Sequence, residues 1–257
     1  MKKSIYSILM CCFIAASCSN EQTIGNDSQM RIQSCYVMSD NSQSENFSSP
    51  IGLYIQDEGG HPYDKGSYYA SLSSGSWTLN EPVYVTKKGY VYSYYPYQAG
   101  VSLPEVSVDM NSQTDWLYTQ TPYEINNGSA SLSIKLYHAL ALLNVSVEND
   151  VVAHLSLESP RTAKLNVCTG IFTEQVSGEV SADSSKLLVI PHTVSSKELK
   201  IRLTSGKEYA YTLDSSHFEQ GKSYTFKFQL NEDREQLEVI SFSVEKWESG
   251  DVFNDYL

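Results

Sequence analysis

The stretch LSIKLYHALALLNVSV, residues 132–147, decides the fold class of this chain. Every second residue is apolar at first, and the alternation then shifts by one position. The first set is Leu132, Ile134, Leu136, Leu140 and Leu142, and the second is Leu143, Val145 and Val147. A period of two is typical of a strand with one face on a core, and a shift of one residue reverses the buried face. The pattern predicts a β-bulge or crease near Leu142 and Leu143, with the strand passing from one packing environment to another.

The same period of two recurs towards the C-terminus. A hairpin is predicted around the turn at residues 205–207, and another alternating strand follows the turn at residues 220–222. The apolar positions are Leu199, Ile201, Leu203, Tyr209, Tyr211 and Leu213, then Tyr224, Phe226, Phe228 and Leu230. No stretch shows a convincing apolar stripe of helical period. The chain is therefore predicted to be all-β.

The N-terminus resembles a bacterial lipoprotein leader. Lys2 and Lys3 precede an apolar run, residues 8–16, that is shorter than the roughly 20 residues of a transmembrane helix. Residues 15–18, Ala-Ala-Ser-Cys, are similar to a lipobox, in which the cysteine is acylated and becomes the first residue. We predict a signal peptide at residues 1–17, lipidation of Cys18 and a flexible tether over residues 18–30.

The length and the turn signals predict two domains. Removing residues 1–17 from 257 leaves about 240, more than a single small β-domain usually contains. Glu148-Asn149-Asp150 follows the phase shift, and the strand pattern then restarts. We expect two β-sandwich domains in tandem, residues 31–149 and 150–257.

The charge balance excludes nucleic acid as a partner. The chain has 30 Asp and Glu against 18 Lys and Arg, a formal net charge of -12. Binding to phosphate requires clustered Lys and Arg, and the sequence has no basic stripe.

Two cysteines, Cys35 and Cys168, remain beyond Cys18 once the leader is removed. An oxidising compartment permits a disulfide between them. They lie far apart in the sequence, and we favour two buried free thiols over a bridge.

No motif for catalysis is present. The sequence has no Gly-x-Ser-x-Gly elbow and no His-Glu-x-x-His. The histidines lack metal-ligand spacing; they are His61, His138, His154, His192 and His217. His138, on an apolar strand face, is read as a hydrogen-bonded core residue. We expect no catalytic residue, no metal site and no cofactor.

The order of several landmarks resembles the fimbrillins, the lipoprotein pilus subunits of the Bacteroidales. The landmarks are Trp77 with Pro82-Val83, the aromatic strand at residues 90–97, Asp115-Trp116-Leu117-Tyr118, residues 138–145, residues 221–226 and residues 244–250. The resemblance covers nearly the whole chain. It implies two transthyretin-like β-sandwich domains, a place in a fimbrium on the outer membrane, cell adhesion, and assembly by donor-strand exchange.

Donor-strand exchange adds a strand of one subunit to an open sheet edge of the next. The resemblance makes residues 32–38 the first strand, with Ile32, Cys35 and Val37 as its core positions. It makes residues 237–247 the donor, whose apolar positions are Leu237, Val239, Ile240, Phe242 and Val244. The alternation of this last strand shifts phase between Val239 and Ile240, which suits a segment that packs in two settings.

One departure from the family concerns maturation. In fimbrillins a protease cuts after a basic residue and releases the first strand, but this chain has no Arg or Lys at residues 39–49, and Arg31 precedes the strand. The subunit is therefore expected to keep its groove closed, which suits an anchoring or accessory subunit better than a repeating stalk unit.

Two functions compete at this point. The first is a pilus subunit whose partners are other subunits or copies of itself, the outer membrane, and a ligand on a host or bacterial surface. The second is a monomeric surface lipoprotein that binds glycans through exposed tyrosines, since the chain has 19 of them. Strand packing is the simpler explanation for the tyrosine-rich segment at residues 84–97.

Overall fold

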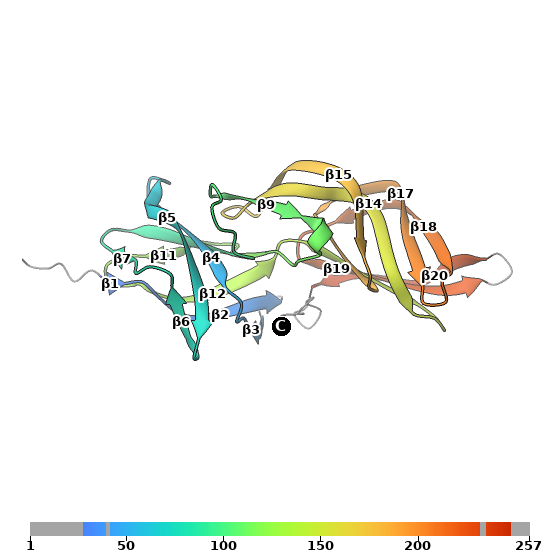
Figure 1. The fold of residues 1–257 in the computed structure, drawn as a ribbon, viewed down its shortest axis with the longest axis horizontal. Helices are drawn as coiled ribbons and strands as arrows, with labels where there is room; N and C mark the ends of the chain where they lie inside the picture. Colours follow the sequence, from blue (N-terminus) through green and yellow to red (C-terminus); the bar gives the residue numbers. More distant parts are fainter. Residues whose placement is uncertain (1–27, 40–41, 232–234, 248–257) are drawn as a thin grey trace, which may run out of the picture.

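A computed structural model describes residues 28–39, 42–231 and 235–247 of the chain. Over these residues the protein consists of strands and one short 3-10 helix, η1 (Met110–Ser112), which confirms the predicted all-β class. None of the described residues belongs to a helix long and apolar enough to cross a bilayer. Figure 1 shows an elongated molecule, with the earlier strands in one half and the later strands in the other.

The first half is built on a nine-stranded sheet. Its order is β3-β2-β12-β10-β8-β4-β5-β6, with β11 also paired to β8. The strands are β2 (Arg31–Ser39), β3 (Ser42–Asn46), β4 (Ile51–Asp57), β5 (Pro62–Ser73), β6 (Ser76–Leu79), β8 (Gly89–Tyr95), β10 (Leu117–Tyr118), β11 (Tyr123–Ile125) and β12 (Ser131–His138). Because β2 contacts β6 from the far side of this order, the sheet curls around its own core. A small sheet of β1 (Ser28–Gln29) and β7 (Tyr84–Val85) lies at one end.

The second half contains two sheets. The four-stranded sheet has the order β16-β13-β19-β20, and the five-stranded sheet has the order β15-β14-β17-β18 with β9 also paired to β14. The strands are β9 (Glu105–Asp109), β13 (Ala141–Val147), β14 (Val152–Asn166), β15 (Phe172–Ala182), β16 (Lys186–Val189), β17 (His192–Leu203), β18 (Glu208–Phe218), β19 (Lys222–Asn231) and β20 (Gln236–Lys246).

Two buried hydrophobic clusters correspond to the two halves. One is built from residues between Met30 and Leu136, and the other runs mainly from Val106 to Trp247 and takes in Tyr54 and Tyr94 of the first half. The arrangement agrees with two packed units. Their division into two transthyretin-like domains stays a prediction.

The phase shift in residues 132–147 marks a passage between two packing environments, as predicted, but it is a break between two strands and not a bulge or crease near Leu142 and Leu143. Strand β12 ends at His138 and β13 begins at Ala141, so the strand is interrupted at Ala139 and Leu140. Strand β12 belongs to the nine-stranded sheet, and β13 lies between β16 and β19 in the second half. The apolar pattern changes phase because the chain leaves one core and enters another.

The turn at residues 148–150 is therefore not the point at which the chain changes halves. Val147 and Asp150 form a β-bridge, and Asn149 has a φ of 65°, so these residues make a turn between β13 and β14 within the second half. In addition β9, from residues 105–109, pairs with β14. The chain passes between the halves at Ala139 and Leu140, before the expected seam near residue 149, and the division into domains of residues 31–149 and 150–257 stays a prediction.

The two halves are fixed to each other by Gln220 and the turn after β14. The Tyr118 hydroxyl donates to Oε1 of Gln220 over 2.9 Å, and Nε2 of Gln220 donates to the carbonyl oxygens of Ala139 and Gly170 over 3.1 and 3.0 Å. Gly170 has a φ of +71°, and a Cβ there would lie 2.4 Å from the Tyr118 ring. Only glycine fits this contact, so the joint is closely packed.

Candidate assembly site

Strand β20 is the last strand of its sheet and has one free edge. It pairs antiparallel with β19 along its whole length, from Lys222 opposite Lys246 to Asn231 opposite Gln236. It pairs with no other strand among the described residues. An unpaired edge presents backbone N–H and C=O groups that can bond a further strand.

A bulge at Ile240 explains the predicted phase shift in this strand. Val239 lies opposite Phe228 and Ser241 lies opposite Lys227, which leaves Ile240 without a partner residue on β19. The extra residue restores the phase, because directly opposed residues of an antiparallel pair point to the same face. Leu237, Val239, Phe242 and Val244 therefore share the core side of the sheet, and not two opposite faces as the sequence pattern indicated.

The core does not cover the bulged Ile240 or the apolar residues that follow it. Leu237 is buried at 9% exposure, whereas Ile240, Phe242 and Val244 are 43%, 50% and 45% exposed. Phe242 lies opposite Phe226 of β19, with ring centroids 4.8 Å apart. We call Ile240, Phe242 and Val244 the β20 ledge.

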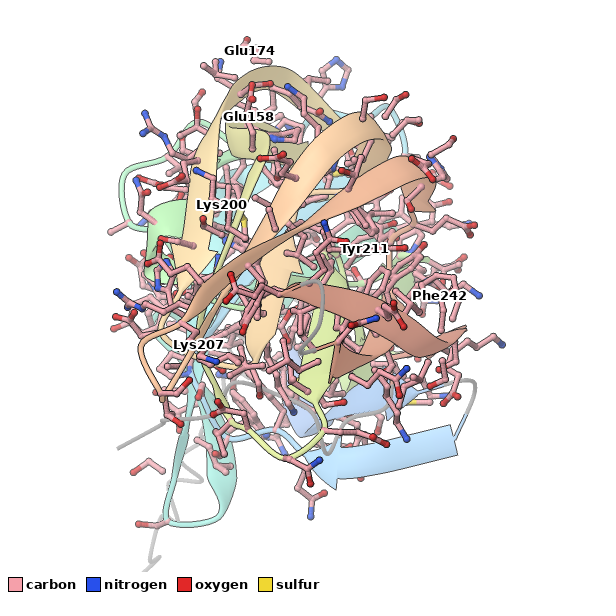
Figure 2. The ribbon with its side chains drawn as sticks, turned by 90° about the vertical axis from the view of Figure 1, so that its right-hand side faces the viewer. Glu158, Glu174, Lys200, Lys207, Tyr211 and Phe242 are labelled. Atoms are coloured by element: carbon pink, nitrogen blue, oxygen red, sulfur yellow. The ribbon has the colours of Figure 1, made fainter. Side chains whose placement is uncertain are left out.

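The ledge exists because the facing sheet ends before it. Tyr211 of β18 packs against the rings of Phe226 and Phe228, at centroid distances of 6.2 and 5.1 Å. Figure 2 shows Phe242 on the outer side of Tyr211, at the margin of the molecule. Strand β18 is the last strand of its own sheet, so no further strand covers β20.

The C-terminal end of β20 is fixed at the junction of the two halves. Trp247 is 1% exposed, stacks on His138, and its backbone N–H donates to the Gly221 carbonyl over 2.9 Å. His138 Nδ1 lies 2.8 Å from Oδ2 of Asp115, and both side chains are buried. This confirms that His138 is a hydrogen-bonded core residue.

The predicted first strand is present and has a neighbour on each side. Ile32, Cys35 and Val37 are 6%, 2% and 4% exposed on β2, which lies between β3 and β12 and runs parallel to β12. These residues belong to the core of the first half, so the structure does not bring them next to β20. The tether predicted over residues 18–30 is wrong for residues 28–30. Ser28 and Gln29 form β1, and Met30 is 1% exposed. Cys18 lies outside the described residues.

Both remaining cysteines are free thiols, as favoured from the sequence. Cys35 is buried, but Cys168 is half-buried, so the expectation that both are buried holds for one of them. Burial raises the pKa of both thiols to about 12, which keeps them protonated and weakly nucleophilic.

Most tyrosines of the segment at residues 84–97 serve as strand packing. Tyr94 is fully buried and Tyr95 is 9% exposed, whereas Tyr84 is 56% exposed. Tyr97 lies beside Tyr69, with ring centroids 4.9 Å apart and an interplanar angle of 33°. This pair resembles the aromatic platform that a glycan-binding protein would need.

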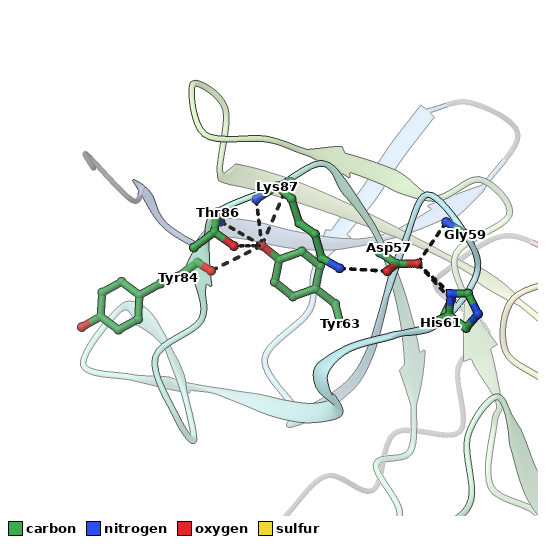
Figure 3. Close-up of polar contacts among 7 residues, drawn as sticks. All are labelled: Asp57, Gly59, His61, Tyr63, Tyr84, Thr86 and Lys87. Atoms are coloured by element: carbon green, nitrogen blue, oxygen red, sulfur yellow. Dashed lines mark hydrogen bonds and ion pairs between the residues drawn. The ribbon is translucent and has the colours of Figure 1, made fainter. Parts of the chain in front are cut away.

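The main polar network of the first half ties turns together (Figure 3). Tyr63 accepts hydrogen bonds from the backbone N–H groups of Thr86 and Lys87 over 2.9 and 3.2 Å, and Lys87 Nζ lies 2.8 Å from Asp57. Asp57 also accepts from the backbone of Gly59 and His61. The bond from Lys87, followed by those from His61 and Gly59, lowers the pKa of Asp57 to about 2. The network is structural, since each of its charges is paired.

No group of three or more metal-binding side chains occurs within residues 28–39, 42–231 and 235–247. We take the free edge of β20 with its apolar ledge as the candidate site. Such an edge binds peptide backbone.

Comparisons with solved structures show similarity over most of the chain. A putative cell adhesion protein from Bacteroides uniformis has 16% sequence identity and a TM-score of 0.62, covering 86% of this chain and 99% of that one. A putative cell adhesion protein from Bacteroides ovatus has 13% identity and a TM-score of 0.60, covering 87% and 99%. The tip fimbrial protein Mfa3 from Porphyromonas gingivalis, with a C-terminal truncation, has 11% identity and a TM-score of 0.50, covering 85% and 98%.

Comparison with curated proteins gives no match. A family model described as fimbrillin-like matches residues 36–247, which is most of the sequence. The matched range begins in β2 and includes β20 with the ledge. The chain therefore belongs to the fimbrillin-like family.

Proposed function

We propose that this protein is a fimbrial subunit that is held on the outer membrane through lipidated Cys18 and joins other subunits by donor-strand exchange through β20. The observation that supports it most is the β20 ledge, three half-exposed apolar side chains on a strand with a free edge. Apolar burial contributes about 25 cal/mol per Å², so covering three such side chains favours a slowly dissociating contact.

The position of β2 supports an anchoring or accessory role. Strand β2 has neighbours on both sides, and Ile32, Cys35 and Val37 are buried. Without Arg or Lys at residues 39–49, a protease of basic specificity has no site there to release this strand. N-terminal sequencing of the surface form is expected to show no start between residues 40 and 51, and a start in that range would contradict a retained β2.

The test of the assembly role replaces apolar side chains on one face of β20, and the strand itself is expected to stay in its sheet. Phe242→Asp with Val244→Asp places two charges on the ledge, and the variant is expected to remain folded, lipidated and monomeric on a native gel of membrane material. Ser241→Asp with Ser243→Asp is the matched control, because it places the same charges on the opposite face of the same strand. If the ledge variant forms the same high-mass assemblies as the parent, the proposed function is wrong.

A second candidate function is glycan binding through aromatic side chains. It is favoured by the Tyr69 and Tyr97 pair, in which Tyr69 is 36% exposed. Tyr69→Ala should then abolish retention of the protein on immobilised glycans without changing its assembly.

A further inference from the structure

A groove of about 960 Å³ lies in the first half of the molecule, between β6 and the start of β2. Strand β6 is the last strand of the nine-stranded sheet, and β2 contacts it from the far side of the strand order. The groove is lined by residues 29–33, residues 75–79, Pro82 and Tyr84. Because β20 belongs to the second half and does not line it, the groove is separate from the candidate assembly site.

Two aromatic side chains that the first core covers only in part line this groove. Trp77 packs against the core but is partly buried, and Tyr84 is 56% exposed. Figure 3 shows the Tyr84 ring pointing away from the network around Tyr63. Tyr84 joins that network only through its carbonyl oxygen, which accepts from the Tyr63 hydroxyl over 3.5 Å. Neither the core nor this network therefore accounts for the Tyr84 ring.

Planar polar side chains form another margin of the groove. Gln29, Arg31 and Gln33 are exposed, and the two residues between them are buried at 1% and 6% exposure. Alternate residues of an extended chain point to the same side, so Gln29 and Arg31 lie in one row. Gln29 is opposite Tyr84 in the pair of β1 and β7, and opposed residues share a face. The polar row therefore begins beside the exposed ring.

Arg31 gives the groove its charge. Among the described residues that line the groove, it alone is charged, and its guanidinium forms no ion pair with any residue that the structure describes. The chain has a formal net charge of -12, so a cationic group without an acidic neighbour in the groove is a local exception. A guanidinium binds a carboxylate through two parallel hydrogen bonds. A carboxylate in the groove would therefore gain a partner and meet no like charge in the lining.

We propose that this groove binds an oligosaccharide with a carboxylate sugar, which places its carboxylate on Arg31 and a sugar ring on Trp77 or Tyr84. The C–H face of a sugar ring packs on an aromatic ring, and a glutamine amide both donates to and accepts from hydroxyl groups. The volume of the groove is in the range that suits a small ligand. This site goes beyond the assembly role, and it differs from the Tyr69 and Tyr97 pair, which does not line the groove.

The lining favours a sugar over a peptide strand. An added strand places alternate apolar side chains against a core, but Met30 and Ile32 beneath the groove are already covered, and β2 already contacts β6 beside it. The accessible groups are two aromatic rings and the side chains of Gln, Arg and Thr. These are groups that bind hydroxyls and carboxylates.

Titration of the purified full chain with matched sugars tests the site, with calorimetry and tryptophan fluorescence as readouts. Sialyllactose is compared with lactose, and trigalacturonic acid with its methyl ester, so that each acidic probe has a neutral counterpart. The two acidic probes separate a sialylated from a uronic acid source. Trp77 reports on the groove, since Trp116 and Trp247 are 3% and 1% exposed. We expect saturable binding of at least one acidic probe, at least tenfold tighter than its counterpart; equal affinities, or no binding of either acid, would overturn the inference.

Variants of the protein locate the binding. Arg31→Gln removes the charge from an exposed position and should weaken the acidic probe at least tenfold, to the level of its neutral counterpart. Arg161→Gln, at an exposed position of β14, is the matched control and should change neither affinity. Tyr84→Ala should weaken the acidic probe as well, because it removes a stacking surface. Far-ultraviolet circular dichroism confirms that the variants fold, and an Arg31→Gln protein that binds the acid like the parent contradicts the proposed site.

Two further outcomes separate this site from its alternatives. Tyr69→Ala leaves the groove intact and should bind the acidic probe like the parent; loss of binding there would assign the sugar to the Tyr69 and Tyr97 pair and overturn the inference. If a synthetic peptide of Gln236–Lys246 alters Trp77 fluorescence and the acidic sugars do not, the groove is a peptide site and the inference is wrong. Failure of the assembly test on β20 leaves this inference standing, because the probes are small and bind a single subunit.

Discussion

Trp247 and His138 stack face to face, with ring centroids 3.8 Å apart and planes inclined by 8°. His138 ends the last strand of the first half, and Trp247 follows the last strand of the second. One aromatic contact therefore joins the point where the chain changes halves to the end of the assembly strand.

Loss of this contact should loosen β20. Trp247→Ala removes a buried indole and is expected to lower the free energy of unfolding by about 3–5 kcal/mol. Hydrogen exchange should speed up most at the backbone N–H groups near Lys246. Trp247→Phe keeps a ring over His138 and should cost less; equal losses in the two variants would show that stacking is unimportant. Chemical denaturation measures both.

Replacement of Gly170 should weaken the joint between the halves. Alanine at a φ of +71° costs about 1–2 kcal/mol in backbone strain, and its Cβ would overlap the Tyr118 ring. The overlap adds about 1–3 kcal/mol. Gly206→Ala is the control, because Gly206 has a φ of +85° but no atom within 4 Å of the added Cβ. Thermal unfolding should place the Gly170 variant clearly below the control, and similar values for both would contradict a close-packed joint.

Asp57 should contribute to acid sensitivity. Its pKa is lowered from 3.8 to about 2, so the folded state favours the ionised carboxyl. The contribution to stability is therefore present above about pH 4 and is lost as the pH falls through 2. Asp57→Asn removes the titrating group, and its stability should fall less steeply than that of the parent between pH 4 and 2. Denaturant midpoints across this range provide the measurement, and parallel curves would rule out a role for Asp57.

Cys18 should carry the lipid. In cells fed a clickable fatty acid, the parent is expected to incorporate the label and to remain in the membrane fraction, and Cys18→Ala is expected to do neither. Cys168→Ala serves as the control for loss of a thiol elsewhere in the chain. Label on the Cys18 variant would contradict the predicted anchor.

The period of two predicted the strands but not their neighbours. The alternation in residues 132–147 identified β12 and β13, and the phase shift marked a real discontinuity. The shift predicted a passage between two packing environments but not its form, because a crease within one strand and a crossing between sheets produce the same one-residue shift. The pairing of β9 with β14 could not be predicted either, because it joins segments that are far apart in the chain and a local pattern does not report on such contacts.

The candidate site, too, could be predicted from the sequence only in part. The apolar positions of β20, including Phe242 and Val244, were identifiable from the sequence, as was the shift at Ile240. Their exposure was not, because it depends on where β18 ends in the facing sheet. Likewise His138 could be read as a core residue, but its partners Asp115 and Trp247 come from distant segments.

The parallel pairing of β2 with β12 sets an order on folding. Ile32 lies beside Leu132, so the first core cannot close until about the first half of the chain is available. The second core needs β20 and Trp247, near the C-terminus. The second half therefore cannot be completed before its last strand is available, and non-local pairing of this kind is associated with folding times of milliseconds to seconds. The protein should therefore stay incompletely folded until β20 and Trp247 are available to close the second core.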